Sequence, residues 1–335
     1  MWWIWPVYII LLVVVTFLSV LLARFVDVLD KKTKMSNGIL GGVLLAGVSS
    51  LPELITSFSA VLLMNQPDMT FGNIMGSNFF DITIIGALMI CMFAFIKNRK
   101  VGKTNGYFIW FSFFLSAVIL VCSFFNWNIS IPVLNINLIS IIILVFYILV
   151  LFLSNKKQSP TEDEEVQTKT SKISEMSAKK IGIWFAVVSA LLVAVSIGIT
   201  YATEFISETY GIGKGIAGAL LLGVATSLPE VVSSVELVRL GNFDMAVGNI
   251  FGSCMFNYLI LSLVDIFYFA GSVFTLGLQA IYFACCMLAS TLVFTIVYYA
   301  KRRNAKIATK PWFYVAIGMV MVTLYIACII FSAGV

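Results

Sequence analysis

The sequence predicts an all-α polytopic membrane protein, with ten transmembrane helices arranged as two inverted five-helix repeats. Three observations lead to this fold class: the composition, a series of long apolar runs, and an acidic motif that occurs twice. Of the 335 residues, 61% are hydrophobic and 11% are charged, whereas the charged content of soluble domains averages about 25%. A chain of this composition is expected to reside in the lipid bilayer.

Ten apolar runs have the length that a membrane-spanning helix requires, about 20 residues. They lie near residues 2–23, 39–64, 69–96, 106–125, 131–153, 181–203, 212–238, 245–269, 276–300 and 311–333. The first run is not expected to be a cleavable signal, because no basic residue precedes it and it exceeds the roughly 7–15 residues of a signal's apolar core.

The charges between the runs predict how the helices are oriented. Basic residues collect in the loops on the inner side of a membrane. If the N-terminus lies outside, the inner loops contain twenty of the 21 lysine and arginine residues, and only Lys214 lies outside. We therefore expect a multi-pass protein of the plasma (inner) membrane with both termini outside.

One long polar segment, residues 154–180, divides the chain into a first repeat at 1–153 and a second at 181–335. Its composition is typical of a solvated, partly disordered cytoplasmic linker. A weak regulatory cation site on the acidic run 162–165 is the alternative. Because five is an odd number of spans, the two repeats are expected to insert with opposite orientations.

Each repeat contains the same acidic motif. Residues 49–53 read Ser-Ser-Leu-Pro-Glu and 226–230 read Thr-Ser-Leu-Pro-Glu, while 72–81 and 248–257 both begin Gly-Asn-Ile. A carboxylate in hydrocarbon costs roughly 2.5–3.5 kcal/mol on insertion scales, and neither Glu53 nor Glu230 is expected to have a basic partner in the membrane. Duplicated acidic segments of this kind indicate an ion transporter with its site at the repeat interface.

The spacing places four polar side chains at one depth. Glu53 lies about 11 residues before the end of its helix, or roughly 16 Å, which is half of a ~30 Å hydrocarbon core. The chain then turns and returns to the same depth at Asp81. The same reasoning applies to Glu230 and Asn257 in the second repeat, so these four side chains are expected to converge.

The residue types around these positions favour a hard cation. Carboxylates, hydroxyls, amide oxygens and the carbonyls that Pro52 and Pro229 release from helical bonding are the oxygen donors that Ca²⁺ prefers, in sets of about 6–8. The chain has no histidine, and the one nearby thiol is Cys254, which argues against Zn²⁺ and Cu⁺. Ser57 and Ser234 are expected to serve helix packing.

Three further acidic residues are expected to have other roles. Asp68 and Asp244 lie where helices begin again after a turn, so they are predicted to be N-caps. Asp265 lies near the outer face and is predicted to be solvated.

These motifs resemble those of the cation/calcium antiporter superfamily, in its sodium/calcium exchanger branch of the prokaryotic type. The likeness covers both signature repeats and the five-plus-five layout, and so nearly the whole chain. The proton/calcium branch typically has a Gly-Asn-x-x-Glu pattern at the glutamate, which is absent here. Two differences stand out: Asp81 and Asn257 are exchanged relative to familiar members, and Cys254 replaces a common asparagine. The Asp-Ile-Thr after Phe80 resembles potassium-dependent exchangers, which leaves potassium co-transport open.

The resemblance implies a role for each site residue. Glu53 and Glu230 would hold Ca²⁺, and polar side chains from both repeats would complete the calcium and sodium pockets: Asp81, Asn257, Ser77 and Ser253. Sodium would use hydroxyls and two backbone carbonyls: Ser49, Ser50, Thr226, Ser227, and the carbonyls near Ala46 and Gly223.

The function expected from the sequence is a secondary antiporter that exchanges Ca²⁺ for Na⁺ by alternating access. Its partners would be these ions and the lipid bilayer, with no nucleic acid, no resident cofactor and no enzymatic activity; the sequence does not determine the oligomeric state. The alternatives are a proton-driven Ca²⁺ exchanger, in which closely spaced carboxylates take up protons, an intramembrane enzyme and a cation channel.

Overall fold

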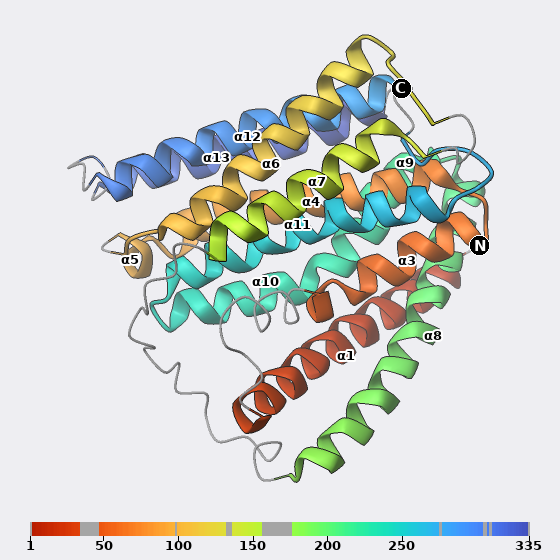
Figure 1. Cartoon of the computed structure of the whole chain (residues 1–335), viewed down its shortest axis with the longest axis horizontal. Helices are drawn as coiled ribbons and strands as arrows, with labels where there is room; N and C mark the ends of the chain where they lie inside the picture. The colour runs from red at the N-terminus through yellow and green to blue at the C-terminus, as the bar shows by residue number, and fades with distance from the viewer. Residues whose placement is uncertain are drawn as a thin grey trace.

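A computed structural model describes residues 2–33, 47–97, 99–131, 136–155, 176–274, 277–303, 307 and 310–333 (Figure 1). The first half consists of α1 (Ile4–Thr33), α3 (Leu51–Leu62), α4 (Pro67–Cys91), α5 (Phe93–Ile96), α6 (Lys103–Phe124) and α7 (Leu138–Asn155). The second half consists of α8 (Ala178–Tyr210), α9 (Lys214–Ala217), the π-helical η1 (Gly218–Leu222), α10 (Gly223–Arg239), α11 (Phe243–Phe267), α12 (Leu278–Arg302) and α13 (Pro311–Ala333).

Eight helical segments in the described part of the chain are long and apolar enough to cross a membrane. Two shorter apolar helices, Leu51–Leu62 and Leu138–Ser154, lie where the other two spans were predicted. The protein is therefore an all-helical, multi-pass membrane protein. The full count of ten spans stays a prediction, because residues 39–46 of the second predicted span lie outside the described residues, as does most of the 154–180 linker.

Loops that the charge pattern assigned to one side of the membrane meet at one end of the molecule. Lys301, at the end of α12, donates hydrogen bonds to the carbonyls of Ile96 (2.7 Å) and Arg99 (2.8 Å) at the α5 end. At the opposite end, the Tyr268 hydroxyl donates to Asn65 Oδ1 at 2.6 Å. These contacts join two loops that were predicted to lie inside and two that were predicted to lie outside, and the orientation of the remaining loops stays a prediction.

Two tight turns return the chain toward the middle of the bundle. Asn65 (φ 55°) precedes α4 and Gly241 (φ 78°) precedes α11, and both residues have the left-handed backbone conformation. Asparagine and glycine are the residues that adopt this conformation most readily. The predicted return of the chain after each glutamate helix is therefore confirmed.

The helices pack around two groups of buried side chains. The larger group joins α4, α6, α7, α11, α12 and α13, and the smaller group joins α1 and α8 with parts of α3 and α10. Figure 1 shows α1 and α8 along one flank and α12 and α13 along the opposite flank, with α4, α10 and α11 between them. The helices that contain the acidic motifs are thus central.

The prediction that Asp265 is solvated was wrong. Its side chain is 1% exposed, and its carboxylate accepts hydrogen bonds from Asn137 N (2.9 Å), Ser140 Oγ (2.6 Å), Ser272 Oγ (2.8 Å) and Val273 N (3.0 Å). The loops that follow α6 and α11 close over this carboxylate and satisfy it. Span hydropathy cannot reveal such a contact between distant loops.

The N-cap predictions for Asp68 and Asp244 were also wrong. Asn242 caps α11 by accepting from Met245 N, and Gln66 is the N-cap residue of α4, so each aspartate lies in the first turn instead. The carboxylate of Asp244 accepts from Gly102 N at 2.6 Å and so caps the neighbouring helix α6.

Candidate functional site

The duplicated acidic residues lie where α3, α4, α10 and α11 pack together. Glu53, Asp81, Glu230 and Asn257 are each 0% exposed. Glu53 interacts electrostatically with Glu230 and Asp81, and Asp81 with Glu230. The three carboxylates, which come from both halves of the chain, therefore lie near one another, as predicted for them.

Glu53 lies in the first turn of α3. Pro52 occupies a position at the start of this helix, where a missing backbone N–H costs little. Neither carboxylate oxygen of Glu53 has a hydrogen-bond partner within the described ranges, although the Thr226 hydroxyl of α10 lies beside it. The carboxylate is thus aimed at the other half of the molecule without being neutralised there.

Glu230 lies in α10, a helix that follows a distorted stretch of backbone. The π-helical turn η1 precedes α10, and Pro229 stands inside α10; both features are typical of irregular helices at functional sites. Oε1 of Glu230 accepts from Ser253 Oγ at 3.3 Å, and the Ser49 hydroxyl lies nearby. Oε2 has no partner among the residues that the structure describes.

Asp81 and Asn257 occupy corresponding places on α4 and α11. Both carboxylate oxygens of Asp81 lack a hydrogen-bond partner in the described part of the chain, and the Ser227 hydroxyl is its neighbour. Asn257 donates through Nδ2 to Asn78 Oδ1 at 3.0 Å, while its own Oδ1 is without a partner in the same residue set. The amide oxygen is therefore a buried acceptor that no described residue satisfies.

The predicted hydroxyl residues join the two halves. Ser50 Oγ lies 3.1 Å from Ser253 Oγ. Ser77 donates to the Gly223 carbonyl at 3.2 Å and lies 3.4 Å from the Thr226 hydroxyl. Of the two carbonyls implied by the resemblance, that of Gly223 thus lies at the cluster, and that of Ala46 falls outside the described residues.

Sequence reasoning missed two asparagines that fix these helices. Asn73 Nδ2 donates to Thr56 Oγ1 at 3.0 Å and Ser57 Oγ at 2.9 Å. Asn249 Nδ2 makes the corresponding bonds to the Ser233 and Ser234 hydroxyls at 3.0 and 3.1 Å. The signal was present, since each asparagine follows the same glycine in its motif. The predicted packing role of Ser57 and Ser234 fits these bonds.

The cluster has the chemistry of a cation site built from mixed oxygens. A buried polar atom without a partner costs free energy, and a bound cation would satisfy several here at once. The described residues contain no group of three cysteine, aspartate or glutamate side chains close enough to hold a metal ion by themselves. Hydroxyl, amide and carbonyl oxygens must therefore complete any coordination sphere, as calcium ligation allows.

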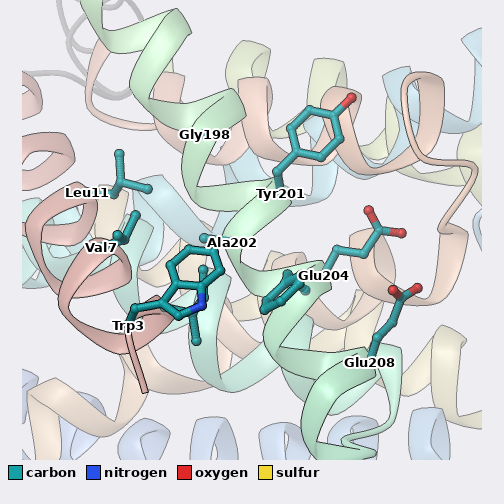
Figure 2. Close-up of a pocket in the computed structure, with 10 residues that line it drawn as sticks. Trp3, Val7, Leu11, Gly198, Tyr201, Ala202, Glu204 and Glu208 are labelled. Atoms are coloured by element: carbon teal, nitrogen blue, oxygen red, sulfur yellow. The ribbon is translucent and has the colours of Figure 1, made fainter. Parts of the chain in front are cut away.

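A separate groove lies between α1 and α8 (Figure 2). Leu11 lines it from α1 and Trp3 from just before that helix, and Glu204 and Glu208 lie at its end on α8. Lys214 pairs with these two carboxylates at 3.6 and 2.9 Å. The acidic groups of this groove already have a cationic partner. The groove therefore differs from the carboxylate cluster of Glu53, Asp81 and Glu230, most of whose carboxylate oxygens lack partners among the described residues.

Helices that cross a membrane and enclose unsatisfied carboxylates define a membrane cation-transport protein. The chain belongs to the sodium/calcium exchanger protein family, whose model matches residues 3–156 and 180–334. The predicted membership of the cation/calcium antiporter superfamily is thereby confirmed. Proteins of this family are transporters, which is the class that the sequence predicted in place of an enzyme.

Proteins with a similar sequence or fold include exchangers of two kinds. The sodium/calcium exchanger MaX1 of Methanosarcina acetivorans is 42% identical over 79 residues, which are 22% of this chain and 23% of that protein. The H⁺/Ca²⁺ exchanger CAX has the same fold, with a TM-score of 0.68 at 14% identity over 98% of this chain and 88% of CAX. The sodium–calcium exchanger NCX_Mj matches with a TM-score of 0.60 at 18% identity over 98% of this chain and 99% of its own.

Proposed function

We propose that this protein is an antiporter that exchanges Ca²⁺ for Na⁺ across the plasma membrane by alternating access. The observation that carries the proposal is the cluster of three buried carboxylates, which have unpartnered oxygens and meet from both halves of the chain. Three negative charges in an apolar interior are tolerable when a divalent cation neutralises most of them. Calcium and a monovalent cation would be the exchanged substrates.

Glu53 and Glu230 would hold Ca²⁺, with Asp81, Asn257, Ser77 and Ser253 completing the pockets. The hydroxyls of Ser49, Ser50, Thr226 and Ser227, with the carbonyl of Gly223, would serve sodium. The support for this assignment is the supply of neutral oxygens beside the carboxylates, since a monovalent ion needs hard oxygen ligands but less charge.

Opposite insertion of the two repeats would give the site its two gates. The helix contacts support this arrangement, because they recur when the two halves are exchanged. α13 packs on α4 as α7 packs on α11, and α1 packs on α10 as α8 packs on α3. The two matches to the family model lie on either side of the polar linker. The loop charges favour outer termini.

Proton coupling is the second candidate, and the burial of the three carboxylates favours it. A carboxylate held in an apolar interior takes up a proton more readily than one in water. The exchanger CAX, whose name states H⁺/Ca²⁺ exchange, shares the fold. The two couplings predict different responses to an imposed sodium gradient.

The test is calcium uptake into proteoliposomes that contain the purified protein. Under sodium coupling, a sodium gradient at fixed pH drives radioactive calcium uptake, and a pH gradient without sodium does not. Glu208→Gln serves as the matched control for Glu53→Gln, because Glu208 lies outside the cluster. Uptake driven by pH alone would establish proton coupling, and no calcium flux under either gradient would overturn the proposal.

A further inference from the structure

Exposed basic side chains from both halves of the chain meet at the end of the molecule that was predicted to face the cytoplasm. One group lies between the end of α5 and the start of α6, and the other lies at the end of α12, which packs beside α6. We call this region the basic corner, and its six exposed side chains are those of Lys97, Arg99, Lys100, Lys103, Arg302 and Arg303.

A buried lysine holds the two groups together. Lys301 is 4% exposed and donates hydrogen bonds to the carbonyls of Ile96 and Arg99, so it fixes the end of α12 to the segment that follows α5. Its ammonium group also lies 5.2 Å from the ring centre of Phe243 and 5.0 Å from that of Tyr314. Carbonyls and aromatic rings stabilise a cation without removing its charge. Lys301 therefore adds to the positive potential of the basic corner.

Carboxylates do not neutralise the basic corner. Within the described residues, no carboxylate forms an ion pair with its side chains or with Lys301, and the ion pairs found there involve Lys214 at the opposite end of the molecule. Asp244 lies beside the corner, but it is half-buried and already accepts from Gly102 N and Asn105 Nδ2, both at 2.6 Å. The basic corner thus has an excess of positive charge.

Two exposed aromatic side chains indicate the depth of the basic corner. Trp110 of α6 donates through Nε1 to the hydroxyl of Tyr299 on α12 at 3.3 Å, and both rings are exposed. Trp110 lies about two turns after Lys103, and Tyr299 about one turn before Arg302. Tryptophan and tyrosine are enriched where a bilayer meets water. The basic corner therefore lies at the level of the lipid head groups.

The arrangement goes beyond what membrane topology requires. The preference for basic residues in inner loops applies to each loop separately and does not require two loops from different halves to meet. Clusters of about 4–8 lysine and arginine residues beside membrane helices attract acidic lipids. Arg302 also donates through Nη1 to the Tyr298 hydroxyl at 3.1 Å. This bond orients a guanidinium group, whose other N–H groups suit phosphate oxygens.

We propose that the basic corner is a binding site for the head group of an anionic phospholipid. The phosphate would lie between the start of α6 and the end of α12, and the acyl chains would follow these helices past Trp110 and Tyr299. The charge of the corner selects an acidic lipid over a zwitterionic one, because a zwitterionic head group has no net charge to attract. The proposal does not depend on which ions the protein exchanges.

The test adds phosphatidylglycerol or phosphatidylcholine with the same acyl chains to the purified full-length protein in detergent. Native mass spectrometry counts the bound lipids and gives their dissociation constants. We expect the wild type to bind phosphatidylglycerol at least about tenfold more tightly. Arg302→Gln combined with Arg303→Gln should lower this preference by about tenfold or more, since each basic residue contributes about fivefold. Lys100→Gln combined with Lys103→Gln should act likewise and leaves the Tyr298 bond in place if the first variant does not fold.

Lys179 and Lys180 provide the matched control, because both are exposed and belong to the start of α8, on the opposite flank from α12. Lys179→Gln combined with Lys180→Gln removes the same charge from the side predicted to be cytoplasmic, and it should retain the preference. Equal binding of the two lipids by the wild type would overturn the proposal, as would an unchanged preference in the folded basic-corner variants.

An equal loss in the control variant would also overturn the proposal, because it would show attraction by the general surface charge. Release of phosphatidylglycerol by millimolar inorganic phosphate would do the same and would identify free phosphate as the ligand. Lipid binding is measured here without an ion gradient. Failure of this proposal therefore leaves the proposed ion exchange intact, and failure of the exchange leaves lipid binding intact.

Discussion

In both the α3–α4 pair and the α10–α11 pair, an asparagine on the second helix joins it to the first. The two pairs differ in the charge of the residue that follows on the second helix. Asn73 binds Thr56 and Ser57 on α3, and Asn249 makes the equivalent bonds to α10. The acidic residue that follows on α4, Asp81, has a neutral amide as its counterpart on α11. The duplicated scaffold thus fixes the helices, while the charge is free to differ between the halves.

The two glutamates also have unequal surroundings. Glu230 receives a hydrogen bond from Ser253 at 3.3 Å, whereas Glu53 has no such bond from any described residue. The first half contributes two carboxylates, Glu53 and Asp81, and the second half contributes one, Glu230. The negative charge of the site is therefore distributed unequally between the halves, and the two sets of ligands are not equivalent.

The largest effect is expected at the two glutamates. Glu53→Gln and Glu230→Gln keep the side-chain shape but remove a charge, and loss of one charged partner from a buried set costs about 3–5 kcal/mol. Calcium transport in proteoliposomes should fall more than about a hundredfold in each variant. Normal calcium flux in either folded variant would remove the residue from the site.

The motif glycines should differ between the halves. A Cβ at Gly72 would collide with the backbone of Gly215, whereas at Gly248 it would meet the end of the Asn105 side chain, at a longer distance. Overpacking of this kind costs about 1–3 kcal/mol, so Gly72→Ala should lower the thermal unfolding temperature more than Gly248→Ala. Gly182→Ala is the control, because no described atom lies near its Cβ position. Equal shifts at Gly72 and Gly248 would contradict the inferred difference in packing.

Asp81→Asn should weaken calcium transport by about tenfold, less than either glutamate change. Its counterpart is already an amide, which shows that the scaffold accepts a neutral oxygen ligand at this depth. Calcium affinity and sodium dependence should be measured together. A variant identical to the wild type in both would make Asp81 a structural residue.

Placing a carboxylate at position 257 should recover part of the calcium transport that Asp81→Asn loses. Asp81→Asn combined with Asn257→Asp retains three carboxylates, and at short range the number of charges outweighs the helix that supplies them. Asn78 could accommodate the change by turning its amide, because its Nδ2 is without a partner within the described residues. Flux should exceed that of Asp81→Asn by about threefold or more. No gain at equal expression would show that positions 81 and 257 are not interchangeable.

The last prediction concerns stability and compares the two asparagines, Asn73 and Asn249, that join the helix pairs. Losing the hydrogen bonds of a buried amide costs about 1–3 kcal/mol. Asn73 is fully buried and Asn249 is half-buried, so Asn73→Ala should lower the unfolding temperature more than Asn249→Ala. Thermal unfolding of both purified variants checks this order. The reverse order would mean that burial does not govern the contribution of these asparagines.

Much of the fold followed from local sequence features. The apolar runs located the described helices, and the turns at Asn65 and Gly241 were predicted from residues on either side of them. Glu53, Asp81 and Glu230 stood out because an unpaired carboxylate in an apolar run is costly wherever it lies. Each of these inferences depends on residues that are close together in the chain.

Features that depend on distant segments had to come from the tertiary structure. The burial of Asp265 depends on two loops that close over it, and the capping of α6 by Asp244 joins opposite halves of the chain. The contact between Asn78 and Asn257 depends on how α4 crosses α11. Sequence by itself determined which residues carry charge into the apolar runs. Only packing decided which partners they meet, because side-chain hydrogen bonds between helices depend on register and rotation that local patterns leave open.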